Sequence, residues 1–338
     1  MTDTLKNDDN KPVAVIVLNW NGEKLLKEFL PSVVELTPSD IADVIVADNN
    51  STDNSVELVE KNFPSVKLLR FSENYGYAGG YNRAIGETGY KYTLLLNSDV
   101  AVIDGWLYPL YEFMESMSDA GACQPKILSY TEPHKFEYAG AAGGFLDRFG
   151  YPYCRGRIMN RIETDRGQYD DTRKVFWASG AALMVRTSVY EEAGGLDESF
   201  FAHQEEIDLC WRMQLLGFGV YAVGSSAVYH LGGGSLHVSD PKKTYLNFRN
   251  NLLMMHKNLP PESRRNRLFV RRLIDTLAFL KFALTFDLKN ARAVVKAHQD
   301  FSAMAKSIEP NGDLTIPDLL RSYPNSGESI FFMRGGDR

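Results

Sequence analysis

The sequence contains few cysteines and no long uncharged hydrophobic run. Its three cysteines, Cys123, Cys154 and Cys210, are widely spaced and form no CxxC pattern, which argues against a disulfide framework or a zinc site. No window of about 18 uncharged apolar residues occurs, so no membrane span is expected. Residues 1–11 are polar and acidic, which predicts a disordered tail and no signal peptide. Together these features predict a cytoplasmic location.

The chain also lacks an excess of positive charge, internal repeats and low-complexity tracts. Its formal net charge of -6 argues against bulk binding of nucleic acid. With 338 residues, 44% of them hydrophobic, the chain is long enough to bury one large core or two modest ones.

Short apolar segments alternate with helical patterns through the first hundred residues. Strands are predicted over 13–18, 43–47, 66–71 and 92–96. The intervening helices are expected around residues 25–30, over 54–62 and from about Tyr81. This alternation is typical of βαβ units and a parallel sheet.

The pattern changes after residue 107. Residues 126–175 are rich in Gly, Tyr and Arg and predict loops and short antiparallel strands. Further along, strands are expected over 176–185, 219–223 and 227–230, and helices over 188–193 and 207–216. From about residue 246 the chain becomes helical and basic, with ten Lys and Arg against four Asp and Glu between Glu262 and Lys306.

Polar loops follow three of the predicted strands, at residues 19–22, 48–53 and 97–99. Because the carboxyl ends of parallel strands meet at one edge of a sheet, these loops could line a single crevice. Asp99 follows three consecutive leucines and is suited to hold a hard divalent cation beside a phosphate-bearing substrate. Asp48 is suited to accept a hydrogen bond from a base or ribose. An equally strong alternative is that Asp48 and Ser51 only cap the next helix.

Three acids, Glu205, Glu206 and Asp208, occur within four residues at the start of a predicted helix. Asp208 can pair with Arg212 one helical turn later, which leaves Glu205 or Glu206 to face a cleft as a general base. The alternative is an acidic helix start on a solvated face.

His230 closes a predicted strand and is followed by Leu231 and three glycines. Imidazole can bind Mn²⁺, and glycines let backbone N–H groups approach a phosphate closely. A structural histidine with satisfied hydrogen bonds is the alternative. Gly76, Gly79 and Gly80 lack the spacing of a dinucleotide-binding fingerprint and predict a tight turn.

Eight segments, in order between residues 12 and about 255, together resemble family 2 glycosyltransferases, and in particular their rhamnosyltransferase-like members. These segments are 15–22, 47–53, 74–82, 95–100, 177–181, 194–201, 205–212 and 228–235. The resemblance implies an α/β GT-A fold with a Rossmann-like, mostly parallel sheet. Residues 12–125 would bind the nucleotide sugar, a smaller mixed region at 126–245 would bind the acceptor, and residues 246–338 would form a helical extension.

The resemblance also implies a reaction. One sugar would move with inversion from a nucleotide-diphosphate donor to a glycan or lipid-linked acceptor in surface polysaccharide synthesis, with Mg²⁺ or Mn²⁺ as cofactor. Asp99 matches the metal ligand of the family's DxD motif, with Asn97 in place of its first acid, and His230 matches a metal- or diphosphate-contacting histidine. Glu206 aligns with the catalytic base. The donor-binding set is Asn19, Asp48, Asn50, Asn82, Asn97, Ser98 and Asp99, and Glu205 and Asp208 complete the catalytic set.

Other functions fit the sequence less well. A sugar-phosphate nucleotidyltransferase needs a glycine-rich triphosphate loop after the first strand, where residues 19–23 offer none. A glycoside hydrolase would leave the strand-end metal site without a role. A silent nucleotide-sugar-binding scaffold would have little reason to keep Asp99, Glu206 and His230 together. Trp177 is expected either to stack on a sugar or to lie in the core.

The basic helices near the carboxyl end have two interpretations. Phe and Leu on one face and Arg and Lys on the other suit docking of residues 262–306 to an anionic membrane, which would make the protein peripheral on the inner face of the cytoplasmic membrane. Alternatively, the apolar stripe packs on the catalytic domain or on a second subunit, as in a homodimer.

Overall fold

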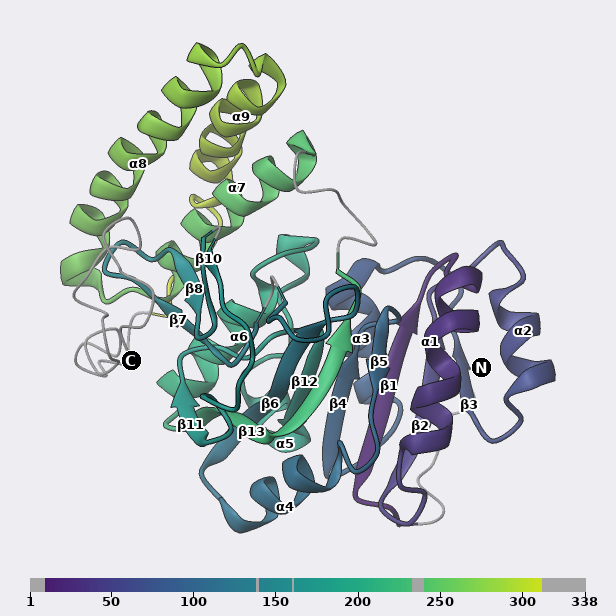
Figure 1. The fold of residues 1–338 in the computed structure, drawn as a ribbon. Coiled ribbons are helices and arrows are strands. Elements are labelled where there is room, and N and C mark those ends of the chain that lie inside the picture. The colour runs from purple at the N-terminus through teal and green to yellow at the C-terminus, as the bar shows by residue number, and fades with distance from the viewer. Residues whose placement is uncertain (1–9, 138–139, 160, 233–239, 312–338) are drawn as a thin grey trace.

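The computed structural model describes residues 10–137, 140–159, 161–232 and 240–311 (Figure 1). Most of the tail predicted over 1–11 lies outside these ranges. So do Gly233, Gly234 and Ser235 of the glycine run after His230.

The amino-terminal part alternates strand and helix as predicted. Its elements are β1 (Val13–Asn19), α1 (Glu23–Leu36), β2 (Ala42–Asp48), α2 (Ser55–Asn62), β3 (Lys67–Arg70), α3 (Gly76–Gly86) and β4 (Tyr92–Leu96). Strand β1 lies between β2 and β4, and all three are parallel; β3 pairs in parallel with β2. The prediction of βαβ units and a parallel sheet is therefore confirmed.

Helix α3 begins five residues earlier than predicted, so most of the expected tight turn is helical. Gly76 at its start has a φ of +71°, a conformation that glycine adopts without strain. A Cβ atom on Gly80 would lie 2.7 Å from Leu18 Cδ1, so glycine here lets α3 lie close against β1.

The second part of the chain extends the same sheet. It contributes β5 (Val100–Val102), α4 (Tyr108–Ser116), β6 (Ala120–Ser129), β11 (Thr172–Val175), β12 (Ala182–Arg186), α5 (Thr187–Glu192), the 3-10 helix η1 (Glu198–Phe200), α6 (Glu205–Leu215) and β13 (Gly219–His230). The strand order is β11-β13-β6-β12-β4-β1-β2-β3, with β5 paired to β13. Strands from both predicted halves thus share one sheet, and the division into halves stays a prediction.

Three sequence predictions in this part need correction. Residues 176–181 are not a strand, because only Ala182–Arg186 pairs with β4. The two strands expected at 219–223 and 227–230 are one strand, β13, interrupted by a register shift between Val223 and Ala227. The first residues of the expected loop region belong to β6, which lies in the middle of the sheet. The rest of that region does form short antiparallel strands: β7 (Gly144–Leu146), β8 (Pro152–Cys154), β9 (Arg157–Ile158) and β10 (Arg161–Ile162).

Both faces of the large sheet are covered, which explains the uninterrupted apolar runs of its strands. Val15 and Val17 of β1 pack in one cluster with residues of α1, α2 and α4. Ile16, between them, packs in the other cluster with residues of α3, α5 and α6. The side chains alternate between two buried faces, as the pleat of a strand requires.

Three helices follow the sheet: α7 (Pro241–Asn258), α8 (Pro261–Leu284) and α9 (Leu288–Met304). Helix α9 packs against α7 and α8, and in Figure 1 α8 and α9 extend away from the sheet as a hairpin. Within the described ranges, no helix has both the length and the hydropathy to cross a lipid bilayer.

Candidate active site

The ends of β1 and β2 form one side of the site. Asn19 and Asp48 are register partners, and Asn19 Nδ2 donates to Asp48 Oδ1 at 2.9 Å. The same amide lies 3.1 Å from Ser51 Oγ and 2.9 Å from Ser55 Oγ, and the Ser51 backbone N–H donates to Asp48 Oδ2 at 2.9 Å. Asp48 therefore orders the turn that leads to α2, as the capping interpretation expected. Each of its oxygens still has acceptor capacity for a ligand.

The two other predicted donor-binding asparagines near these strand ends, Asn50 and Asn82, differ in whether their side chains are free to bind a ligand. Asn50 is exposed with a φ of +62°. Asn82 is occupied: its Nδ2 donates to the Leu196 carbonyl at 2.8 Å, and its Oδ1 accepts from the Leu196 N–H at 2.9 Å and the Tyr190 hydroxyl at 2.5 Å. Donor binding by Asn82 stays a prediction, and its contacts fasten α3 to the turn before η1.

The end of β4 offers open polar groups. Asn97 and Ser98 are half-buried, and in the described part of the chain their side chains make no hydrogen bond. The Asn97 backbone N–H donates to the Ala181 carbonyl at 3.0 Å, which ties this end of β4 to the segment before β12.

Asp99, His230 and Glu137 form a buried row beside that strand end. Strands β5 and β13 pair His230 with Val100, which brings His230 Nε2 to 3.1 Å from Asp99 Oδ1. On the other side of the ring, Nδ1 lies 3.4 Å from Glu137 Oε2. Burial alone would lower the pKa of His230, but hydrogen bonds to Asp99 and Glu137 and their negative charges raise it to about 10. His230 therefore lies between two carboxylates, whose charges favour its protonated form.

These residues fit a metal site that uses one protein carboxylate together with substrate phosphates, and not a site built from three or more protein ligands. The described residues contain no cluster of three or more His, Cys, Asp or Glu side chains that could hold a metal ion. A metal-ligand role for His230, whose Nε2 lies 3.1 Å from Asp99 Oδ1, stays a prediction. Asp99, with only one oxygen engaged, remains as a carboxylate ligand. Mg²⁺ in nucleotide sites typically takes one or two carboxylates and completes its shell with phosphates and water, and the donor set fits that arrangement.

Glu205 and Glu206 begin α6 and are the most perturbed acids of the site. Oε2 of each is buried without a hydrogen-bond partner among the described residues. Burial raises the pKa of Glu206 to about 7. Burial, together with the charge of Glu206, raises the pKa of Glu205 well above its ordinary value. Burial therefore favours the protonated form of both glutamates, and the charge of Glu206 adds to this effect at Glu205.

The segment before β12 joins the acidic pair to the strand ends. A Cβ atom on Gly180 would lie 3.7 Å from Glu206 Cβ and 2.7 Å from the Tyr77 hydroxyl oxygen. That hydroxyl donates to the Gly180 carbonyl at 2.9 Å. Gly180 precedes Ala181, whose carbonyl binds the backbone of Asn97. Two consecutive residues, Gly180 and Ala181, thus link Glu206 to the Asn97–Asp99 loop, and the single crevice stays a prediction.

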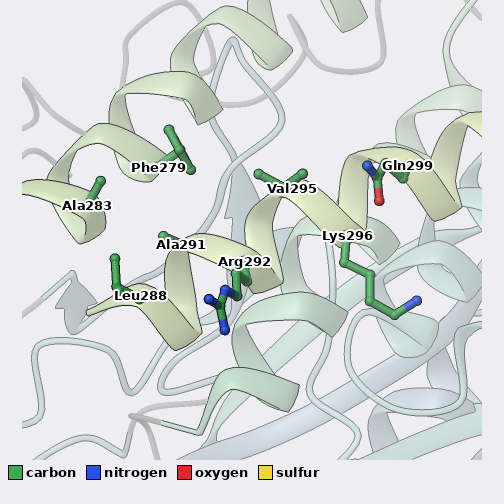
Figure 2. A pocket seen from close by; sticks show the side chains of 8 residues that line it. All are labelled: Phe279, Ala283, Leu288, Ala291, Arg292, Val295, Lys296 and Gln299. Atoms are coloured by element: carbon green, nitrogen blue, oxygen red, sulfur yellow. The ribbon is translucent and has the colours of Figure 1, made fainter. Parts of the chain in front are cut away.

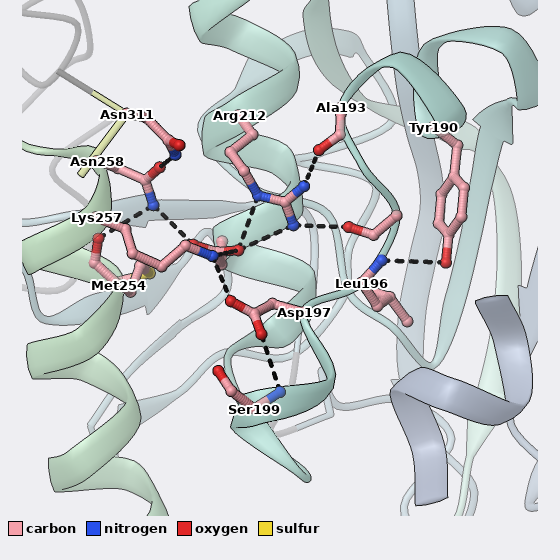
Figure 3. Close-up of polar contacts among 12 residues, drawn as sticks. Tyr190, Ala193, Leu196, Asp197, Ser199, Arg212, Met254, Lys257, Asn258 and Asn311 are labelled. Atoms are coloured by element: carbon pink, nitrogen blue, oxygen red, sulfur yellow. Dashed lines mark hydrogen bonds and ion pairs between the residues drawn. The ribbon is translucent and has the colours of Figure 1, made fainter. Parts of the chain in front are cut away.

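Asp208 is fully buried, and its carboxylate is held in a polar cluster between α6 and α7. Its carboxylate accepts from Arg212 Nε at 2.9 Å, Lys257 Nζ at 2.9 Å and Asn258 Nδ2 at 2.8 Å. Figure 3 shows these three donors converging from α6 and α7. The predicted pairing with Arg212 is present. The contacts mark Asp208 as a positioning residue, and a catalytic role for it stays a prediction.

The segment just before the acidic pair has an unusual backbone. Phe201, His203 and Gln204 have φ values of 66°, 70° and 73°, which cost energy for side chains larger than glycine. Asn250 Nδ2, from α7, donates to the carbonyls of Phe200, Ala202 and His203 at 3.0, 2.8 and 2.7 Å. Helix α7 therefore holds residues 200–204, and with them the start of α6, in place.

The structure decides between the two alternatives for Trp177 and adds one residue, Glu137, that the sequence did not predict. Trp177 is 5% exposed and its Nε1 donates to the Phe145 carbonyl at 3.0 Å, so the core alternative is the correct one. Glu137 was missed, because no motif surrounds it. It reaches His230 only because residues 128 and 136 bridge after β6.

Comparison with known proteins gives a consistent result. The family model described as "Glycosyl transferase family 2" matches residues 14–194. The N-acetylglucosaminyl-diphospho-decaprenol L-rhamnosyltransferase of Mycobacterium tuberculosis is 27% identical over 235 residues, which is 64% of this chain and 75% of that protein. The low-salt glycan biosynthesis hexosyltransferase Agl10 of Haloferax volcanii is 25% identical over 248 residues, 71% of this chain and 74% of the relative.

Solved structures are similar in fold at low identity. The crystal structure of S. aureus TarS 1–349 in complex with UDP-GlcNAc superposes with a TM-score of 0.57 at 18% identity, covering 86% of this chain and 80% of that one. The mannosyltransferase PcManGT from Pyrobaculum calidifontis, in complex with GDP-Man and Mn²⁺, gives 0.53 at 13% identity, covering 88% and 77%. These are GT-A structures, so the predicted fold class is confirmed.

Proposed function

This chain belongs to glycosyl transferase family 2, and from that premise we propose that it transfers one sugar, with inversion, from a nucleotide-diphosphate donor to a hydroxyl of a glycan or lipid-linked acceptor. The observation that carries the proposal is the proximity of Glu206 to the Asn97–Asp99 loop across Gly180 and Ala181. A relative that acts on a diphospho-decaprenol acceptor supports a lipid-linked acceptor and a role in surface polysaccharide synthesis.

The donor would lie along the strand ends. Asn19 and Asp48 would contact the base or ribose, with Asn50, Asn97 and Ser98 lining the same edge. Asp99 would hold a bound Mg²⁺ or Mn²⁺, which would supply positive charge beside the leaving group. In its protonated form His230 would add a second positive charge there, and its contact with Asp99 would hold that carboxylate in one orientation.

Glu206 is the proposed base. The acceptor oxygen forms a bond to the anomeric carbon as the bond from that carbon to the diphosphate oxygen breaks. The electron pair leaves with the nucleotide diphosphate, and the hydroxyl proton passes to Glu206. The pKa of Glu206 is about 7, so a large share of its side chain is a carboxylate at neutral pH. Burial and the charge of Glu206 raise the pKa of Glu205 well above its ordinary value, which favours its protonated form.

A donor screen tests the proposal. Thermal shift with a panel of nucleotide diphosphates, with and without Mn²⁺, should identify the nucleotide, and NMR of the product should show the inverted anomer. Asp99→Asn should abolish the Mn²⁺-dependent part of the nucleotide-induced shift. A matched control is Asp104→Asn, at an exposed position beyond β5. Binding without turnover for every donor and acceptor would favour the scaffold alternative, and a retained anomer would contradict the single displacement.

Cellular position and assembly follow as further parts of the proposal. A lipid-linked acceptor would be met at a bilayer, so we propose a peripheral position on the inner face of the cytoplasmic membrane. A homodimer stays a prediction.

A further inference from the structure

Helix α8 carries an exposed apolar stripe. Phe269, Leu273, Leu277, Leu280 and Leu284 recur every three or four residues, so they share one face of the helix. All are exposed: Leu277 retains 65% and Leu284 78% of its accessible surface. The stripe therefore does not pack on the catalytic domain, which was one of the two interpretations of the sequence.

The apolar surface continues around the turn between α8 and α9. Phe286 is 87% exposed at the tip, and Leu288, the first residue of α9, is also exposed. Exposed apolar residues on a continuous patch of this kind mark an interaction surface, since isolated ones are common and contiguous ones are not.

The segment that carries this surface is basic, although the protein as a whole is acidic. Residues 262–306 carry six more positive than negative charges, although the whole chain carries a net charge of -6. One of the four acids in this segment, Asp275, is fully buried and paired with Arg271 at 2.9 Å. The hairpin is thus the part of the molecule that an anionic surface would attract.

A groove between the two helices combines both properties. It has a volume of about 430 Å³, with Phe279 of α8 and Leu288 and Val295 of α9 on its apolar wall. Arg292 and Lys296, one helical turn apart on α9, stand at its edge (Figure 2). An apolar wall beside two cations suits an anionic headgroup together with the upper part of its acyl chain.

The hairpin is fixed in orientation by a buried polar cluster on its inner side. Asp275 accepts from the Tyr151 hydroxyl at 3.0 Å and lies 3.1 Å from His298 Nε2 of α9. Arg271, on the same side of α8, also bonds Asn251 of α7. The apolar stripe, opposite this cluster on α8, is thereby held pointing outward from the catalytic domain.

We propose that the α8–α9 hairpin, residues 261–304, docks on an anionic lipid bilayer, with the stripe and tip among the acyl chains and Arg292 and Lys296 at the headgroup phosphates. The charge of the patch favours this occupant over a second copy of the chain. A symmetric dimer through the hairpin would place two positively charged patches opposite each other. The inference deepens the proposed acceptor side of the reaction, but it concerns binding alone and does not need an active enzyme.

Vesicle flotation of the full chain, without sugar nucleotide, tests the proposal. The wild type should float with phosphatidylcholine vesicles that contain phosphatidylglycerol and not with pure phosphatidylcholine. Lys296→Gln should lower the partition coefficient about fivefold, because one basic residue near an anionic surface contributes about that much. The matched control is Lys61→Gln on α2: both lysines are exposed and both pair with an acid four residues away. Leu277→Ser and Leu284→Ser should each weaken flotation further.

Each other outcome overturns the proposal. If Lys61→Gln and Lys296→Gln lowered the partition coefficient equally, the overall charge of the protein would explain vesicle binding and the hairpin would have no special role. Failure of the wild type to float would exclude the bilayer. If sedimentation then showed a dimer that Leu277→Ser dissociates, the surface would be an interface between copies. Transfer to a soluble acceptor, measured on the same preparations, separates this inference from the proposed activity, since Lys296→Gln should leave that rate unchanged.

Discussion

Replacing Glu206 by Gln should slow the enzyme and stabilise the fold at the same time. The amide keeps the size and shape of the side chain but takes no proton from the acceptor hydroxyl. Loss of a positioned general base lowers the rate by about 10²–10⁴-fold, so kcat should fall within that range while the affinity for the donor stays the same.

The gain in stability follows from the burial of Glu206. Its pKa rises from 4.5 to about 7 in the folded protein, so the folded state binds the proton more tightly than the unfolded state. Stability from this group is complete below about pH 4.5 and is lost as the pH rises to about 7. The difference reaches at most about 3 kcal/mol at pH 8, and Glu206→Gln removes this penalty. Its Tm should therefore exceed that of the wild type at pH 8, and the two should converge near pH 5.

The pH dependence of the rate provides the assay. In the wild type, log kcat/KM should rise with unit slope below about pH 7 and level off above it, because only the carboxylate form of Glu206 is a base. Glu205→Gln is the matched control, since Glu205 begins the same helix and is equally deprived of a hydrogen-bond partner at Oε2. It should keep the acid limb and most of the rate. A Glu206→Gln enzyme that retained full activity, or kept an unchanged acid limb, would refute the assignment.

Three further changes test the surroundings of the site. Asp208→Ala leaves Lys257 and two other buried donors without this carboxylate, so the free energy of unfolding should fall by about 3–5 kcal/mol in chemical denaturation. Asn250→Ala removes the donor shared by three carbonyls of residues 200–203, and kcat should fall more than donor affinity in steady-state kinetics. Tyr77→Phe removes the part-buried hydrogen bond to the Gly180 carbonyl and should lower the free energy of unfolding by about 1 kcal/mol, read from the Tm.

The parts of the fold that the sequence predicted well depend on local patterns. The runs before Asn19, Asp48 and Asn97 each combine a buried strand with a polar end, and parallel pairing alone then brings those ends together. The expected helix start at the acidic pair was also placed within two residues. Such features need no knowledge of distant parts of the chain.

The parts that the sequence did not predict depend on long-range contacts. Strand β6 contains Gly121, Gln124 and Pro125, residues that seldom mark a central strand. The Oε1 atom of buried Gln124 accepts from the Ser179 N–H at 2.9 Å, 55 residues away, and its Nε2 donates to the Ala141 carbonyl at 3.3 Å. Residues 176–181 have the composition of a strand, yet such contacts hold them as a buried loop. Glu137 and the carbonyl clamp of Asn250 depend on tertiary contacts in the same way.

The position of Asn250 has a consequence for protein engineering. Helix α7 follows the sheet in the sequence, but its Asn250 binds the carbonyls of the segment that directly precedes Glu205 and Glu206. A chimaera that took its last ninety residues from a homologue would therefore have the homologue's residue in place of Asn250, and its own residues 200–204 would be held by a different side chain. A new membrane anchor should instead be joined after Asn258, the last residue of α7. The original α7 and its hydrogen bonds to residues 200–203 are then kept.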